Sequence, residues 1–179
     1  MSIINPSKPA KLIIGLFMQR KGLFKPAAQE LIEKFGDADI ISPWFSFDYT
    51  DYYKPEMGAP LYRRVLSFKK NIRQSSLSKI KIITNNLELK YSENGRRRIN
   101  IDPGYMLLER FVLATGKNYS HRIYIGMGVY ADLTLIYQGG GYRKLAWTYP
   151  DYAAPDMIMF LELVRKKYRF DLIGSGLND

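Results

Sequence analysis

The stretch Leu12-Ile13-Ile14-Gly15-Leu16-Phe17-Met18 is an unbroken apolar run of seven residues near the start of the chain. It is too short to cross a bilayer, because a membrane-spanning helix needs about 20 apolar residues. Gln19, Arg20 and Lys21 follow it directly, where an export signal would offer small residues for cleavage. We therefore expect a buried β-strand over Lys11–Met18, in a cytoplasmic protein without a membrane span.

The segments that follow this strand show alternating helix and strand patterns. Side chains of Leu61–Lys70 alternate with the two-residue period of a strand, whereas apolar residues of Ser75–Ser92 recur every three or four positions, as in a helix. In chain order we expect strand 11–18, helix 25–35, strand 39–47, strand 61–70, helix 75–92 and strand 97–101. This βαββαβ order is that of a ferredoxin-like fold.

The C-terminal part is expected to extend this core. Asp102-Pro103 has the form of a helix cap with proline in the first turn, which predicts a helix that ends near Gly116. Beyond it we expect strands over 121–125, 129–137 and 142–147 and a helix over 155–170. Since no linker or low-complexity stretch divides the chain, we predict a single domain over residues 1–179, an α+β two-layer sandwich with a ferredoxin-like core.

The composition excludes several classes of site. The 179 residues include no cysteine and one histidine, His121. This rules out disulfides, zinc–thiolate and iron–sulfur centres, thiol nucleophiles and multi-histidine metal sites. The carboxylates have no diagnostic spacing, so no metal site is predicted and no cofactor is indicated.

The charge distribution favours an anionic ligand. The formal net charge is +10, and the segment 57–87 holds seven basic residues and no acidic one. A basic surface of this kind attracts phosphate-bearing ligands. We predict an anion-binding surface made of Arg63, Arg64, Lys69 and Lys70. The alternative is that these side chains only cover solvated faces.

An eleven-residue pattern occurs twice, at 47–57 and 147–157. Both copies read aromatic-x-Tyr-x-Asp-Tyr-x-x-Pro-acid-Met. Each follows a predicted strand, and the Asp, Pro and second acid suit a turn that leads into a helix. One interpretation is two similar turns anchored by tyrosines. The other is that the copies form two walls of one site, in which tyrosine rings stack on a planar ligand.

Two glycine-containing strings resemble nucleotide-binding motifs without their context. Gly126–Ala131 matches G-x-G-x-x-A, yet the residues after it alternate like a strand and do not open a helix, so a hairpin is expected. Thr115-Gly116-Lys117 resembles the end of a phosphate loop, but Phe111 stands where the upstream glycine belongs. We do not predict phosphate binding there.

Candidate ligand-binding residues lie in the repeats, at the Asp102 corner and at the start of the strand that follows. They are Asp51, Tyr52, Asp102, Tyr105, His121, Arg122, Asp151 and Tyr152. If these strand ends meet at one edge of the sheet, they surround a single cleft in which aspartates and histidine orient the ligand. In the competing interpretation each aspartate satisfies local backbone donors, and Asp102 is a helix cap.

The stretches Phe47–Tyr53, Arg97–Tyr105, His121–Leu135 and Trp147–Tyr152 resemble those of an uncharacterised bacterial and archaeal family, the domain-of-unknown-function family four-four-one-six. The resemblance extends over nearly the whole chain. It implies a shared fold and a prokaryotic origin, but no activity, substrate or catalytic residue.

Three functional hypotheses follow. The charge excess favours a small cytoplasmic binding protein for a phosphate-bearing ligand, a nucleotide or RNA. The second hypothesis is an enzyme, an acid–base or magnesium-dependent hydrolase or transferase whose site gathers Asp51, Asp102, His121 and Asp151. The third is a scaffold subunit of an oligomer of unknown size.

Overall fold

A computed structural model describes residues 1 and 3–174 of the chain. The strands are β1 (Ala10–Met18), β2 (Ala38–Ile41), β3 (Phe45–Phe47), β4 (Leu61–Ile72), β5 (Ile99–Met106), β6 (Arg110–Thr115), β7 (Arg122–Tyr124), β8 (Tyr130–Gln138) and β9 (Gly141–Lys144). The α-helices are α1 (Phe24–Phe35), α2 (Lys54–Met57), α3 (Leu77–Lys90) and α4 (Pro155–Gly174). The short 3-10 turns η1 (Lys21–Leu23) and η2 (Gln74–Ser76) lead into α1 and α3.

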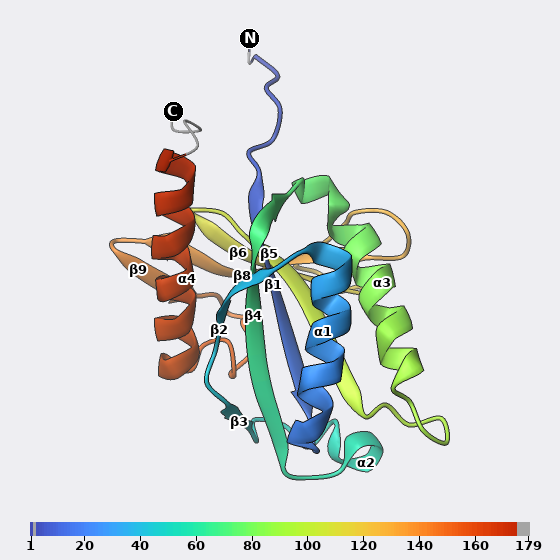
Figure 1. Ribbon diagram of the computed structural model, residues 1–179. Coiled ribbons are helices and arrows are strands. Elements are labelled where there is room, and N and C mark those ends of the chain that lie inside the picture. The colour runs from blue at the N-terminus through green and yellow to red at the C-terminus, as the bar shows by residue number, and fades with distance from the viewer. Residues whose placement is uncertain (2, 175–179) are drawn as a thin grey trace.

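The nine strands of the described residues form one sheet in the order β2-β4-β1-β5-β6-β8-β7 (Figure 1). β3 also pairs with β4, and β9 also pairs with β8. Every neighbouring pair is antiparallel. Together with the helices, this confirms the predicted α+β class.

Helices cover both faces of the sheet. Figure 1 shows α1 and α3 on one side and α4 on the other. In β1, Leu12 and Ile14 belong to the cluster packed under α1 and α3, whereas Ile13 belongs to the cluster under α4. The predicted two-layer sandwich is therefore wrong. Apart from Lys11, which pairs with Asp39, β1 is apolar because each of its faces is buried under its own helices.

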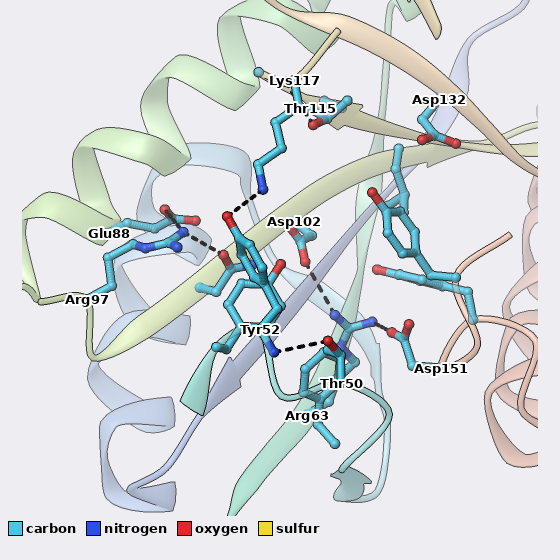
Figure 2. A pocket seen from close by; sticks show the side chains of 18 of the residues that line it. Thr50, Tyr52, Arg63, Glu88, Arg97, Asp102, Thr115, Lys117, Asp132 and Asp151 are labelled. Carbon is cyan, nitrogen blue, oxygen red and sulfur yellow. Dashed lines mark hydrogen bonds and ion pairs between the residues drawn. The ribbon is translucent and has the colours of Figure 1, made fainter. Parts of the chain in front are cut away.

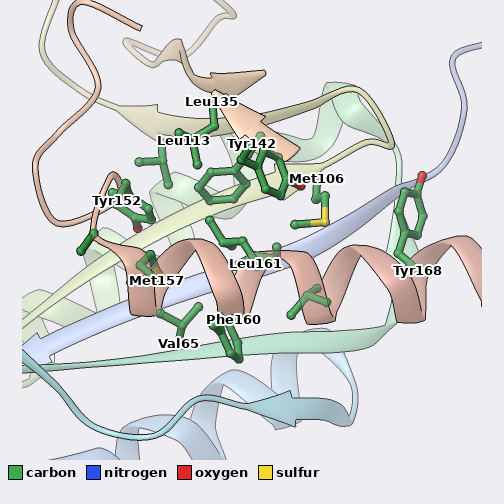
Figure 3. Close-up of a cluster of buried hydrophobic side chains, with 14 of the residues drawn as sticks. Val65, Met106, Leu113, Leu135, Tyr142, Tyr152, Met157, Phe160, Leu161 and Tyr168 are labelled. Atoms are coloured by element: carbon green, nitrogen blue, oxygen red, sulfur yellow. The ribbon is translucent and has the colours of Figure 1, made fainter. Parts of the chain in front are cut away.

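The longest helix, α4, covers its side of the sheet with residues spaced three and four positions apart. These buried residues are Met157, Phe160, Leu161, Val164, Tyr168 and Leu172. They pack with Val65, Met106 and Leu113 of β4, β5 and β6 (Figure 3). In the described part of the chain, every helix is too short or too polar to span a bilayer.

The helix predicted from Asp102 to Gly116 is wrong, because β5 and β6 form a hairpin there. The two backbones approach closely at Gly104, where a Cβ would lie 2.5 Å from the carbonyl oxygen of Val112. Both faces of this hairpin are covered, so most of its residues are buried and apolar side chains do not alternate. Such a run cannot be told from a buried helix by its periodicity.

Pro103 is compatible with β5 because it lies where its missing N–H breaks no bond to β1. The backbone N–H and carbonyl of Ile101 point away from β1, toward α3. Alternate residues of a strand direct these groups to the same side, so Pro103 also faces away from β1. Proline is tolerated in a strand at such positions.

One predicted strand is divided in two, and two predicted glycine turns are confirmed. The predicted strand 39–47 is divided into β2 and β3 at Ser42, whose N–H and hydroxyl both bond the backbone of Val65 at 2.9 Å. The hairpin at Gly126–Gly128 is confirmed, with positive φ at both glycines. The glycine link between β8 and β9 is also confirmed, although β9 ends at Lys144.

Candidate functional site

A pocket of about 760 Å³ lies where the sheet divides between β5 and β6. β1 pairs with β5 along Ile99–Met106, whereas β6 pairs with β5 only over Gly104–Met106. Beyond this short ladder the pocket is lined by Asn100 and Asp102 of β5 and by Thr115 of β6. Its volume lies within the range of small-molecule sites, about 300–1,000 Å³.

Two charged side chains of α3 take the place of the missing strand beside β5. Lys81 Nζ donates to the carbonyl oxygen of Ile101 at 2.9 Å, and Glu88 Oε1 accepts from the N–H of the same residue at 2.6 Å. Lys81 and Glu88 are seven positions apart, which places them on one face of the helix. Both are buried, and burial raises the pKa of the Glu88 carboxyl although Lys81 opposes this.

The two repeat segments, 47–57 and 147–157, line the same pocket (Figure 2). The first contributes Phe47, Tyr49, Thr50, Tyr52 and Tyr53, and the second contributes Tyr149, Pro150, Asp151 and Tyr152. Two segments 100 positions apart in the chain therefore form walls of one pocket, as the one-cleft interpretation requires.

The equivalent aspartates of the two repeats have different surroundings. The Asp51 side chain is 84% exposed, pairs with Lys54 at 2.6 Å and does not line the pocket. Asp151 is buried in an ion pair with Arg63. Arg63 also contacts Asp102, with Nη2 at 3.3 Å from Oδ2. Of the two aspartates, Asp151 alone is a pocket residue.

The equivalent tyrosines differ in the same way. Tyr52 is 63% exposed, and its hydroxyl accepts a hydrogen bond from Lys117 Nζ at 2.9 Å (Figure 2). This bond lowers the pKa of the Tyr52 phenol. Tyr152 is 2% exposed, and burial raises the pKa of its phenol to about 12. The first repeat thus forms the rim of the pocket and the second its buried wall.

Arg63 lies among aromatic rings and is not a surface cation. Its guanidinium carbon is 4.7 Å from the ring centroid of Phe47, 4.8 Å from that of Tyr152 and 5.2 Å from that of Phe17. The residue is 3% exposed. Stacking on aromatic faces together with carboxylate pairing is a geometry that suits arginine in particular. Of the residues of β4, Arg63 lines the pocket, whereas Val65 on the same face of the strand packs in the core under α4.

The predicted anion-binding surface of Arg63, Arg64, Lys69 and Lys70 does not form. Neighbouring strand residues point to opposite faces, so Arg64 lies on the side of α1, 4.7 Å from the ring of Phe24. Lys69 pairs with Asp37 at 3.3 Å near the other end of β4, and Lys70 is exposed beside it. Only Arg63 of the four lines the pocket.

His121 and Arg122 do not line the pocket but lie next to residues that do. His121 stacks on Trp147 with centroids 4.8 Å apart, and its Nε2 is 3.4 Å from Asp132 Oδ2. Arg122 donates from Nε to Asp132 at 2.8 Å and from Nη2 to the Tyr149 hydroxyl at 2.5 Å. Asp132 and Tyr149 are lining residues, whereas His121 and Arg122 are not. Arg122 therefore acts on the pocket through Asp132 and Tyr149.

The observed site also differs from the predicted one at Tyr105, which was predicted, and at several lining residues that were not. Tyr105 is buried in a separate core cluster and does not line the pocket. Polar lining residues that were not predicted include Lys81, Glu88, Arg97, Asn100 and Lys117. A usable signal was present for two of them, because Lys81 and Glu88 are charges next to the apolar positions of a predicted helix.

The pocket contains both signs of charge. Its cations are Arg63, Lys81, Arg97 and Lys117, and its anions are Glu88, Asp102, Asp132 and Asp151. No group of three or more side chains suited to hold a metal ion occurs among residues 1 and 3–174. The site can therefore offer aromatic faces, paired charges and hydrogen bonds to an organic ligand.

Residues 8–168 match the model of the family described as Domain of unknown function (DUF4416). The chain belongs to this family. The four stretches that resemble the DUF4416 family each contribute residues to the pocket. Neither a curated protein nor a solved structure matches the chain.

Proposed function

We propose that the pocket binds a small phosphate-bearing ligand with a planar ring, of the nucleotide class. The observation that supports this most directly is the meeting of two tyrosine-rich repeats in one pocket with Lys117 at its rim. Among the described residues, Lys117 Nζ has the Tyr52 hydroxyl as its hydrogen-bond partner and no carboxylate. An ammonium of this kind is free to pair with a phosphate.

The aromatic lining supports the planar part of the ligand. Tyr49, Tyr53 and Tyr149 all line the pocket, and Tyr149 is held by its bond to Arg122. Aromatic rings bind a planar heterocycle by stacking, which contributes about 1–3 kcal/mol per base. A pocket with rings inside and a cation at the rim suits a ligand with a ring at one end and a phosphate at the other.

The distribution of charge favours a nucleotide over RNA. Binding to an RNA backbone needs a continuous basic surface. The candidate cations of β4 are divided between two faces and two ends of the strand, and Arg63 is buried. A ligand that enters the pocket as a single unit agrees with this arrangement.

We also propose a ferredoxin-like core and a cytoplasmic location for the protein. Apart from β3 and α2, which lie between β2 and β4 in the chain, the elements β1, α1, β2, β4, α3 and β5 follow one another in βαββαβ order. Their strands lie in the order β2-β4-β1-β5. This supports a ferredoxin-like core, to which β6–β9 and α4 are added. The cysteine-free composition suits a cytoplasmic location.

A second candidate is an enzyme that uses the same pocket for acid–base chemistry. Glu88 lines the pocket and has a raised pKa, a property that a carboxyl needs for proton transfer near neutral pH. Incubation with nucleotides followed by ³¹P NMR tests this. Turnover that Glu88→Gln abolishes without changing nucleotide affinity would support the enzyme; unchanged spectra would exclude it for those substrates.

Calorimetric titration with nucleoside monophosphates and diphosphates tests the binding function. We expect Lys117→Gln to weaken binding by about 10- to 100-fold, because one charge-assisted hydrogen bond to phosphate is lost. Lys69→Gln is the matched control, since Lys69 is an exposed lysine outside the pocket, and should leave affinity unchanged. Absence of nucleotide binding, or equal effects of the two substitutions, would overturn the proposal.

A further inference from the structure

We infer that the ligand enters ring first, and that a carbonyl oxygen on its ring accepts a hydrogen bond from the Asn100 amide at the buried end of the pocket. This rests on the proposed function and adds which part of the nucleotide is recognised inside. The phosphate remains at the rim beside Lys117. The ligand class is therefore a free mononucleotide with a base that carries a carbonyl group.

Asn100 has a donor that is buried, oriented and unused. The residue is 4% exposed and lines the pocket. Its Oδ1 accepts from Arg97 Nη1 at 2.9 Å. Because a guanidinium only donates, Oδ1 must face Arg97 and the amide nitrogen must point elsewhere. No described residue accepts from that nitrogen. A buried donor without a partner costs about 1–3 kcal/mol, which a ligand acceptor would offset.

The orientation of Asn100 is fixed by its neighbours. Arg97 pairs with both carboxylate oxygens of Glu56, each at 2.7 Å, and also contacts Glu88 at 3.5 Å. These bonds lower the pKa of the Glu56 carboxyl, which keeps it ionised. Arg97 is thus held in place and cannot turn toward a phosphate without losing Glu56. The Asn100 amide is presented to the pocket by a rigid support.

Arg63, in the same row of the sheet as Asn100, carries a second unused donor. Arg63 and Asn100 are both register partners of Phe17, one on each side of β1. Partners in one row point to the same face. Arg63 Nε is buried and has no hydrogen-bond partner among the described residues. Each of these buried donors requires an acceptor, and a carbonyl oxygen is a group that only accepts.

The charges around these donors favour an acceptor that is itself uncharged. Arg63 is paired with Asp102 and Asp151, and Arg97 with Glu56. A phosphate or carboxylate placed here would meet carboxylates whose cations are already occupied. A neutral carbonyl meets no such repulsion. Figure 2 shows Lys117 approaching the pocket from a different element than Arg97 and Glu88, so the rim and the buried end can receive different parts of one ligand.

The protein-side test is Asn100→Asp, which keeps the acceptor for Arg97 and the side-chain size but removes the unused donor. Affinity for inosine 5′-monophosphate is compared with affinity for ribose 5-phosphate, which has no base. We expect wild type to prefer the nucleotide and Asn100→Asp to lose about 10- to 100-fold of that preference. Asn85→Asp introduces the same charge at another lining residue and should retain the preference.

The ligand-side test needs no altered protein. Purine riboside 5′-monophosphate lacks the base carbonyl of inosine 5′-monophosphate, together with the N1 proton, and should bind wild type about 10-fold or more weakly. Equal binding of these two nucleotides, or an undiminished preference in Asn100→Asp, would overturn this inference and leave the proposed function standing. If neither nucleotide nor ribose 5-phosphate binds wild type, the proposed function itself fails.

Discussion

Arg63 and Asp151 stand 88 positions apart in the chain and form a buried ion pair inside the pocket. The pair joins β4 to the turn that precedes α4, and the Tyr152 ring stacks against the same guanidinium. Asp102 of β5 completes the group. A helix on one face of the sheet is thus connected to two central strands through one arginine.

The first prediction concerns this pair. Asp151→Ala should lower the free energy of unfolding by about 3–5 kcal/mol, because it leaves a buried guanidinium without its closest carboxylate. Urea denaturation measures the change. Asp51→Ala removes the equivalent aspartate of the first repeat, which is exposed, and should change stability by no more than about 0.5 kcal/mol. Similar losses for both substitutions would contradict the structure.

The second prediction concerns the hairpin that the sequence analysis missed. Gly104→Ala should destabilise the protein by about 1–3 kcal/mol, because its Cβ would lie 2.5 Å from the Val112 carbonyl oxygen. Gly22→Ala is the control, since a Cβ there meets no atom within 4 Å. Thermal denaturation of both variants makes the comparison. A stable Gly104→Ala protein would argue that β5 and β6 do not pair here.

The third prediction concerns the rim. The hydrogen bond and charge of Lys117 lower the pKa of the Tyr52 phenol below its usual value of 10.0. Lys117→Met should therefore raise that pKa toward 10.0. NMR titration with ¹³C-labelled tyrosine measures it, and Tyr52→Phe assigns the resonance. Lys69→Met should leave the resonance unmoved, and a Tyr52 pKa that is the same with and without Lys117 would rule out the contact.

The fourth prediction is a pH dependence of stability. Burial raises the pKa of Glu88 in the folded protein above 4.5, so folding favours the protonated carboxyl. The stabilisation that comes from the protonated Glu88 carboxyl is fully present below the pKa of this group in the unfolded protein. It is lost as pH rises through the pKa of the group in the folded protein. The stability of Glu88→Gln relative to wild type should therefore increase as pH rises from about 4 to 7. A relative stability that is independent of pH would contradict the raised pKa.

Local patterns predicted the first half of the fold well. The apolar run of β1, the alternation in β4 and the spacing of α3 each place one element in its observed position. The segment after Asp102 failed because its two signals conflict. A cap-like Asp-Pro pair favours a helix, whereas pairing with β1 on one side and β6 on the other stabilises strands. That pairing is a long-range property which no local window contains.

The site was predicted where its residues belong to a recognisable pattern. The repeats indicated that Tyr52, Asp151 and Tyr152 share one pocket, and the structure places them there. The different surroundings of Asp51 and Asp151 could not be foreseen, because they depend on which copy lies next to Arg63. Asn100 was missed for a similar reason, since its role depends on Arg97 and on the face of β5.

The replacement of a strand by Lys81 and Glu88 has a consequence for aggregation. An open strand edge inside a sheet would offer its N–H and carbonyl groups to the extended segment of another molecule. In β5 the groups of Ile101 are already bonded to these two side chains, and Pro103 has no N–H to offer. The sheet can therefore open at the pocket without providing a template on which a second chain could add a strand.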